Sequence, residues 1–211
     1  MKLSRISLVF SLILFICSVL SAQRDYYDYL PEDRTTVFFE DFDDENSSKF
    51  WTGKNREHKG KIKFGQYLFK SVAIGLKPSY MAPHFDIDPS KNFAVEMMLS
   101  SNGNDYGLVW GQDKSLERFY YFNLIKRGFI IKNEKKIIIK GKIKKLVTEW
   151  NKITLRKINQ TYYLFVNEQL VYEMPYEPIS NIRIGIGTPG WKVFVEYFGI
   201  YYLNAKNEFR N

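Results

Sequence analysis

Closely spaced acidic residues are the first feature of this sequence that could support chemistry. Glycoside hydrolysis requires two carboxylates roughly 5 to 9 Å apart on either side of the scissile bond. The densest acidic run is Glu40-Asp41-Phe42-Asp43-Asp44-Glu45, whereas Glu96 and Glu117 stand alone. We interpret the run as a solvated acidic turn, with a structural calcium ion as the alternative, because calcium prefers carboxylate oxygens. Neither the run nor the isolated acids predict an acid–base pair.

A histidine with two aspartates is the most site-like group of polar residues. His84, Asp86 and Asp88 alternate with Phe85 and Ile87, so a strand would place the three polar side chains on one face. They could ligate a metal, but no second histidine lies nearby to complete a typical set. The alternative is a half-buried edge strand, bracketed by prolines, with Phe85 and Ile87 directed inward. We favour the edge strand, and the sequence predicts no metal and no other cofactor.

The remaining motifs do not indicate catalysis. The glycine-rich segment Gly185-Ile186-Gly187-Thr188-Pro189-Gly190 connects two predicted strands, whereas a phosphate-binding loop leads into a helix N-terminus. The sequence has no Ser/His/Asp signature. It therefore favours a protein without catalytic activity.

A first candidate binding surface is aromatic. Aromatic residues make up 17% of the chain, and their rings can stack on the C–H faces of sugars while Asn and Arg satisfy hydroxyl groups. Trp191 follows Pro189-Gly190 in a loop and is the best candidate for an exposed platform. For the other rings, packing inside the fold is the alternative. The candidate ligand-binding residues are Tyr106, Trp110, Arg118, Phe119, Tyr121, Asn123 and Trp191.

A second candidate surface is basic. Lysine and arginine residues crowd the segment from Lys126 to Lys145, which contains one acid, Glu134. On an edge strand, such lysines would prevent pairing with a second sheet. The functional alternative is attraction to a polyanion, such as an acidic polysaccharide or an anionic membrane surface. We favour the protected edge. The candidate polyanion-binding residues are Lys132, Lys135, Lys136, Lys140 and Lys142.

Short strands must position all of these residues. From Val37 onward, apolar runs are broken by Gly, Asn, Pro and Lys at intervals of about ten residues, which is the spacing of a sandwich or barrel. The segment from Arg118 to Ile125 carries large side chains on both faces, so one face would cover the core and the other would be partly exposed or bind a ligand. Apolar residues change parity within the last strand, Val193 to Leu203, which predicts a β-bulge near Glu196 and Tyr197.

The N-terminal residues indicate an exported protein. A basic start with Lys2 and Arg5, an apolar run of about 15 residues and the small residues Ser21-Ala22 form the layout of a secretory signal peptide. The run is shorter than the ~20 residues that span a bilayer, so we expect no membrane span after its removal. Cys17, the single cysteine, would leave with it, and 29 basic against 23 acidic residues would remain, a net charge of +6. We expect a periplasmic, cell-surface or secreted protein, for which nucleic acid is not an expected partner.

The order of short motifs resembles that of a known superfamily. The motifs are Phe39-Glu40-Asp41-Phe42, Phe93 with Glu96, Tyr106-Gly107-Leu108-Val109-Trp110-Gly111, Tyr120-Tyr121-Phe122, Trp150-Asn151-Lys152-Ile153, Phe165-Val166-Asn167, Ile184-Gly185-Ile186 and Val195-Glu196-Tyr197-Phe198. Their series resembles the concanavalin A-like lectin/glucanase superfamily, in the branch with laminin G-like modules and 3-keto-disaccharide hydrolase-type domains. The resemblance implies a jelly roll of two stacked antiparallel sheets, one concave, which meets ligands, commonly glycans, on the concave face or at the loops of one edge.

The same resemblance leaves the activity open, because this fold hosts lectins, glycosidases and structural domains alike. Laminarinase-type enzymes take their acids from one strand in a Glu-x-Asp-x-x-Glu pattern. The nearest approach here is the run that begins at Glu40, in which Phe42 occupies the place of the middle acid.

The sequence therefore predicts an all-β, two-sheet antiparallel sandwich in an exported, non-catalytic module that binds carbohydrate through the concave sheet and edge loops. The alternatives are a glycoside-acting hydrolase of the 3-keto-disaccharide hydrolase type and a structural or protein-interaction domain. Two carboxylates facing each other across the concave sheet would favour the hydrolase. The expected organisation is a signal peptide at 1–22, a linker or loosely ordered arm at 23–36, the concanavalin A-like sandwich at 37–204 and a C-terminal tail at 205–211.

Overall fold

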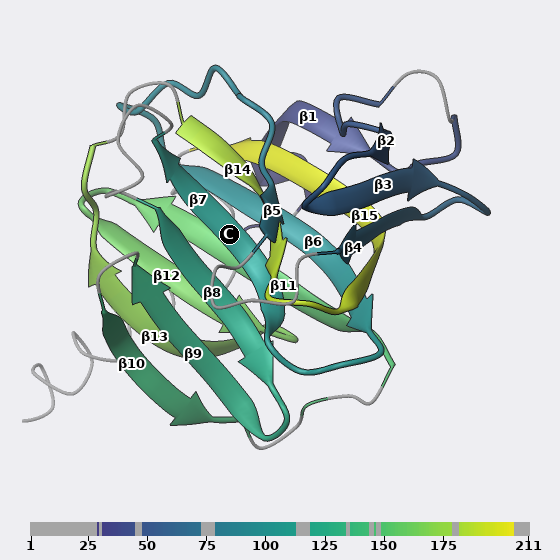
Figure 1. The fold of residues 1–211 in the computed structure, drawn as a ribbon. Coiled ribbons are helices and arrows are strands. Elements are labelled where there is room, and N and C mark those ends of the chain that lie inside the picture. Colours follow the sequence, from purple (N-terminus) through teal and green to yellow (C-terminus); the bar gives the residue numbers. More distant parts are fainter. Residues whose placement is uncertain are drawn as a thin grey trace, which may run out of the picture.

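Alternating apolar residues produce short antiparallel strands along the chain, stacked in two sheets (Figure 1). The computed structural model describes residues 29, 31–44, 48–72, 79–112, 119–133, 136–143, 146, 149–178 and 182–204. Within them, the one helical element is a 3₁₀ turn, η1, at Pro31–Asp33. The predicted all-β, two-sheet jelly roll is confirmed.

The larger sheet has nine strands in the order β13-β12-β11-β6-β15-β4-β3-β2, and β1 also pairs with β15. Its strands are β1 Arg34–Glu40, β2 Gly53–Lys54, β3 His58–Ile62, β4 Tyr67–Ser71, β6 Phe93–Ser101, β11 Asn151–Ile158, β12 Thr161–Val166, β13 Gln169–Pro175 and β15 Lys192–Leu203. The smaller sheet has six strands in the order β10-β9-β8-β7-β14-β5. Its strands are β5 Ser79–Met81, β7 Tyr106–Gln112, β8 Tyr120–Ile125, β9 Gly128–Asn133, β10 Ile137–Lys142 and β14 Ile182–Thr188.

The core lies between the two sheets and follows the period of two that a pleated strand imposes. On β8, Tyr120, Phe122 and Leu124 belong to the core cluster, and β7 contributes Leu108 and Trp110. Trp110 stacks on Tyr120 with ring centroids 5.3 Å apart and meets Tyr162 of β12 edge-on at 6.0 Å. Aromatic pairs of this geometry add to the free energy gained by burying the rings.

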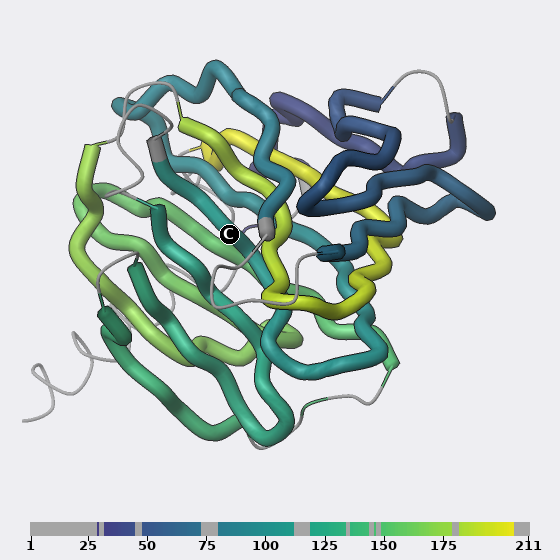
Figure 2. Tube along the Cα trace, viewed as in Figure 1, coloured from purple at the N-terminus to yellow at the C-terminus, as the bar shows by residue number. Residues whose placement is uncertain are grey.

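The long strand β15 joins distant parts of the chain. It pairs with β6 along one side and with β4 and β1 along the other, so the dark blue β3–β4 hairpin lies beside the yellow C-terminal strand (Figure 2). The register between β15 and β6 shifts between Val195 and Tyr197. This shift is the predicted β-bulge, and it places Val193 and Val195 before it and Phe198 and Ile200 after it in one core.

The first strand starts earlier than the expected sandwich, and several expected segments lie outside the described residues. Strand β1 begins at Arg34, three residues before the expected start of the sandwich, because Arg34 to Thr36 pair with the end of β15. The predicted signal peptide, half of the predicted arm and the C-terminal tail lie outside the described residues, as do Arg118 and Lys135. Among the residues that are described, no helix is long and apolar enough to cross a membrane.

Candidate functional site

Trp191 forms an exposed aromatic platform at one end of the sandwich. It lies in the β14–β15 connection, and 43% of its surface is accessible. The indole lies over Gly103 of the β6–β7 connection, where a Cβ atom would collide with the ring. The Trp191 backbone N–H donates to Thr188 Oγ1 at 3.3 Å, and the next N–H, from Lys192, donates to Asn102 Oδ1 at 3.1 Å. These contacts between two connections hold the ring in place without covering it.

Polar side chains lie on the outer face of the six-stranded sheet and in the β6–β7 connection that Trp191 covers. Asp105, two residues after Gly103, accepts a hydrogen bond from Asn123 Nδ2 and lies 3.8 Å from Lys132 Nζ. The Lys132 ammonium also lies 5.5 Å from the ring centroid of Tyr121. Asn123 is fully buried, and its Oδ1 has no hydrogen-bond partner in the part of the chain that the structure describes. We call Trp191, Asp105, Asn123, Tyr121 and Lys132 the edge cluster.

A small apolar group supports the edge cluster from the same face. Val109, Phe119 and Tyr121 are buried together, apart from the main core, and Tyr80 packs on Phe119 with ring centroids 5.0 Å apart. The sequence predicted that the second face of this strand would be partly exposed or would bind a ligand. Its aromatic rings are instead buried, so within the edge cluster Trp191 is the ring with an open face.

The structure thus brings together some of the predicted ligand-binding residues and separates others. The outer face of the six-stranded sheet carries Phe119, Tyr121 and Asn123. Trp191 lies in the β14–β15 connection at the end of that sheet. Trp110 and Tyr106 point the other way, because they alternate with Gly107 and Val109 along β7, and both are buried in the core between the sheets. These two rings are therefore core residues, which corrects their assignment as ligand contacts. The same burial removes Phe119, Tyr121 and Asn123 from direct contact with a ligand, and it leaves Trp191 as the exposed side chain among the described candidates.

The lysines of the predicted basic surface lie in two places, along the edge strand β10 and on β9. Strand β10 is the edge of the six-stranded sheet, as the favoured interpretation requires, and its exposed lysines, with the one just before it, are Lys136, Lys140 and Lys142. Lys132 lies on β9 and belongs to the edge cluster instead. Lysines along an unpaired edge are a common protection against sheet-to-sheet association.

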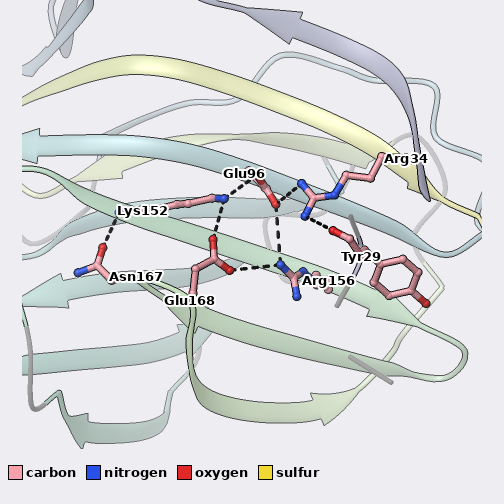
Figure 3. A network of polar contacts seen from close by, with 7 residues as sticks. All are labelled: Tyr29, Arg34, Glu96, Lys152, Arg156, Asn167 and Glu168. Atoms are coloured by element: carbon pink, nitrogen blue, oxygen red, sulfur yellow. Dashed lines mark hydrogen bonds and ion pairs between the residues drawn. The ribbon is translucent and has the colours of Figure 1, made fainter. Parts of the chain in front are cut away.

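No described strand carries two acidic residues, so the one-strand acid pattern of laminarinase-type enzymes has no counterpart in the described strands. Two carboxylates do meet elsewhere, on the outer face of the nine-stranded sheet (Figure 3). Lys152 Nζ lies 2.9 Å from Glu96 Oε2 and 2.7 Å from Glu168 Oε1. The shared ammonium therefore holds the two carboxylates close to each other.

Cations surround both carboxylates of this charged network. Arg34 Nη1 lies 2.9 Å from Glu96 Oε1, and Arg156 Nη2 lies 3.3 Å from Glu168 Oε2 and 4.0 Å from Glu96 Oε1. The Arg34 guanidinium also donates to the backbone carbonyl of Tyr29 at 3.0 Å. The two Glu side chains thus face three cations.

The ionisation of the network follows from burial and from these partners. Although partial burial acts in the opposite direction, the Lys152 ammonium and the Arg156 guanidinium hold the pKa of the Glu168 carboxyl below its ordinary value. Burial likewise opposes the charge on Lys152, but Glu96 and Glu168 raise the pKa of its ammonium. Burial lowers the pKa of the Arg156 guanidinium, although both carboxylates counteract it.

The Glu168 carboxyl makes the stability of the fold dependent on acid. Because its pKa is lower in the folded chain, its contribution to stability is fully present above the unfolded pKa, about 4.3, and is lost as the pH falls through the folded value. We expect the thermal midpoint of the wild type to fall more steeply below pH 5 than that of Glu168→Gln. Melting curves followed by circular dichroism from pH 6 to pH 3 measure this, and parallel curves would contradict the role of Glu168.

The histidine and the two aspartates behave as an edge segment. His84 forms an isolated bridge with Arg183 of β14, Phe85 is buried and Ile87 packs against the core. His84 Nε2 lies 3.8 Å from Asp86 Oδ1. No group of three or more potential metal ligands occurs among the described residues.

Sequence reasoning missed Asp105 and most of the charged network. Asp105 precedes β7 in a connection and has a positive φ of 67°, a conformation that aspartate tolerates better than most residues. Lys152, Thr154 and Arg156 alternate with the buried Ile153 and Leu155 of β11, and this alternation could have identified an outward polar row. Glu168 reaches the row from the β12–β13 turn, where Asn167 and Glu168 both have positive φ.

Comparisons with known proteins find the same fold among solved structures and no similar sequence among protein families or curated proteins. No protein family matches the sequence, and no curated protein matches it. Among solved structures, it is similar to a GlcNAcα1-4Gal-releasing endo-β-galactosidase from Clostridium perfringens, with a TM-score of 0.59 at 9% identity; the likeness covers 83% of this chain and 65% of the galactosidase. It is also similar to the catalytic domain of an endo-1,3-β-glucanase (laminarinase) from Thermotoga petrophila, with a TM-score of 0.57 at 10% identity, over 83% of this chain and 99% of that one.

A third likeness is to the CBM2 module of the evolved Dit protein of Lactobacillus casei phage J-1. Its TM-score is 0.52 at 8% identity, and the likeness covers 82% of this chain and 98% of the module. These structures share the concanavalin A-like jelly roll that the sequence predicted. At such low sequence identities the likeness establishes the fold alone, so the function has to be inferred from the residues of the site.

Proposed function

We propose that this protein is an exported, non-catalytic module that binds carbohydrate at the edge cluster. The solved structures that it resembles include glycanases and a CBM2 module, which supports a carbohydrate-related function at a coarse level.

One observation carries the proposal, namely that Trp191 is both exposed and fixed. Sugar rings present apolar C–H faces to aromatic rings, and a platform that is already ordered loses little conformational entropy on binding. Asp105 and Lys132 are both partly exposed and lie 3.8 Å apart on the outer face of the six-stranded sheet. They provide the donors and acceptors that sugar hydroxyls require.

A hydrolase of the 3-keto-disaccharide type is the second candidate, and the pair Glu96 and Glu168 is the observation that favours it. The two carboxylates lie close together, because one ammonium contacts both, and glycosidases use a pair of nearby carboxyl groups. However, a general acid is usually a carboxyl with a raised pKa, and the pKa of Glu168 is lowered. Both carboxylates are also engaged by Lys152. We therefore propose a stabilising role for this pair.

A glycan array probed with the chain from residue 23 onward tests the proposal, together with an assay for new reducing ends. We expect selective binding to a subset of glycans and no release of reducing ends from those that bind. The charge-reversal variant Lys136→Glu/Lys140→Glu should retain this binding, because the two lysines protect an edge strand. Loss of binding in that variant would point to the basic edge instead, and release of reducing ends would establish the hydrolase.

A further inference from the structure

A second aromatic surface lies on the outer side of the nine-stranded sheet, where β1, the β3–β4 hairpin and β15 meet (Figure 1). These elements enclose a shallow depression of about 510 Å³. The residues that line it are Phe39, Asp41, Asp43, Phe64, Gly65, Gln66, Glu196 and Tyr197. Phe39 is 49% exposed and stacks on Tyr197 with ring centroids 6.1 Å apart.

Phe64 adopts a backbone conformation with positive φ, which phenylalanine rarely adopts. The β3–β4 turn is closed by Lys63 N–H donating to the Gln66 carbonyl at 2.9 Å, and its two central residues, Phe64 and Gly65, have φ of 55° and 65°. A two-residue turn of this kind prefers Asn-Gly, because a bulky side chain is strained at positive φ. Phe64 is nevertheless 86% exposed, so the ring gains little from burial in return for the strain. An outlier of this kind is reason to look for a ligand contact.

The bulge in β15 directs a carboxylate toward the same depression. Glu196 is the extra residue between Val195 and Tyr197, and it is exposed and lines the depression. Asp41 and Asp43 enter from the segment after β1. Bulges often reorient a side chain next to a binding site.

The depression is negative in a chain that is otherwise basic. The formal net charge is +8, yet Asp41, Asp43 and Glu196 form no ion pair with any residue that the structure describes. Aromatic rings beside unneutralised carboxylates are the combination that recognises an organic cation, through cation–π attraction and charge-assisted hydrogen bonds. Phe64 already faces one cation of the chain itself, because Lys63 Nζ lies 4.4 Å from its ring centroid, so a bound ammonium group would take the place of Lys63 on this ring.

We propose that this depression is a second binding site, for a saccharide that carries a protonated amine. The rings of Phe39 and Phe64 would contact the apolar face of the sugar, and Asp43 and Glu196 would pair with its ammonium group. The saccharide part of this assignment rests on the proposed function, whereas the ammonium part rests on the depression alone.

Calorimetric titration with the β-1,4-linked glucosamine tetrasaccharide, at a pH where its amines are protonated, tests the proposal. The fully N-acetylated tetrasaccharide is the matched neutral probe. We expect the N-acetylated form to bind at this site at least tenfold more weakly, and raising the salt concentration to weaken the glucosamine complex. Equal affinity for the two probes would overturn the proposal.

Two sets of variants separate binding from folding. Phe64→Asn removes the ring but suits positive φ, so we expect about tenfold weaker glucosamine binding with an unchanged or higher thermal midpoint. Asp43→Asn/Glu196→Gln should weaken binding about tenfold, while the control Asp86→Asn, at a side chain that is 97% exposed in the β5–β6 connection, should not. Retained affinity in both of the first two variants would contradict the assignment.

The test of this second site is independent of the test of glycan binding at the edge cluster. Trp191→Ala should leave glucosamine binding unchanged, so a failure of the edge cluster would not affect this result. If tetralysine binds as tightly as the glucosamine tetrasaccharide, with the same loss in Phe64→Asn, the site recognises a peptide cation and the saccharide assignment is wrong.

Discussion

Replacement of Glu96 by glutamine is expected to lower the free energy of unfolding by about 3 kcal/mol. The Glu96 side chain is 5% exposed, and its carboxylate lies 2.9 Å from both Arg34 and Lys152. The neighbouring Arg156 side chain is 2% exposed. Glutamine preserves the shape but leaves three cations with Glu168 as their remaining carboxylate in the network. A buried charge that loses its partner is far more costly than a surface ion pair.

Urea denaturation followed by tryptophan fluorescence measures this change. Glu173→Gln, an exposed acid on β13 of the same sheet, is the matched control and should shift the free energy of unfolding by less than about 0.5 kcal/mol. A change below 1 kcal/mol in Glu96→Gln, about the size expected of a surface pair, would show that the network does not stabilise the sheet.

Replacement of Trp191 by alanine is expected to weaken binding of a glycan selected from the array about thirtyfold, which corresponds to about 2 kcal/mol. The platform provides the open aromatic face of the edge cluster, and its removal leaves the buried rings of Tyr121 and Phe119 unable to substitute for it. Because Trp191 is partly exposed and packs over Gly103 in a surface connection, the fold should remain intact.

Trp51→Ala is the control for Trp191→Ala. Trp51 is also an exposed tryptophan, but it packs on His58 beside the nine-stranded sheet, with ring centroids 5.1 Å apart. Its substitution should change glycan affinity less than about threefold. A similar loss in both variants would mean that binding reflects general aromatic exposure rather than a defined site, whereas unchanged affinity in Trp191→Ala would exclude the edge cluster.

The fold could be predicted because strand patterning reports directly on the two faces of a sheet. Alternation along β8 separated Tyr120 and Phe122 from Tyr121 and Asn123, and the change of parity in β15 located the bulge at Glu196. Short-range patterns of this kind survive folding because a pleated strand can turn only one set of side chains toward the core.

The burial of each face could not be predicted from the same patterns. Trp110 and Tyr121 both alternate with other apolar residues, yet one fills the space between the sheets and the other belongs to a separate cluster on the outside. Trp191 was identified for a different reason, since a Pro-Gly pair before it indicated a turn rather than a strand.

The pairing of charges depends on contacts between residues that are distant in sequence. Glu96 meets Arg34 and Lys152 because β6 lies between β15 and β11, with β1 on the far side of β15. Its isolation in the sequence therefore concealed a buried network. The negative depression could not be predicted either, because its rings and carboxylates come from segments that are distant in sequence: β1 and the residues after it, the β3–β4 turn and the bulge of β15.

The most direct test of the central claim is a nuclear magnetic resonance titration that follows the indole N–H signals of the four tryptophans. Each signal is assigned from a Trp→Phe variant, and the glycan selected from the array is added to saturation. We predict that the Trp191 signal moves with the binding isotherm while that of the buried Trp110 stays in place. Saturation of the protein without movement of the Trp191 signal would contradict carbohydrate binding at the edge cluster.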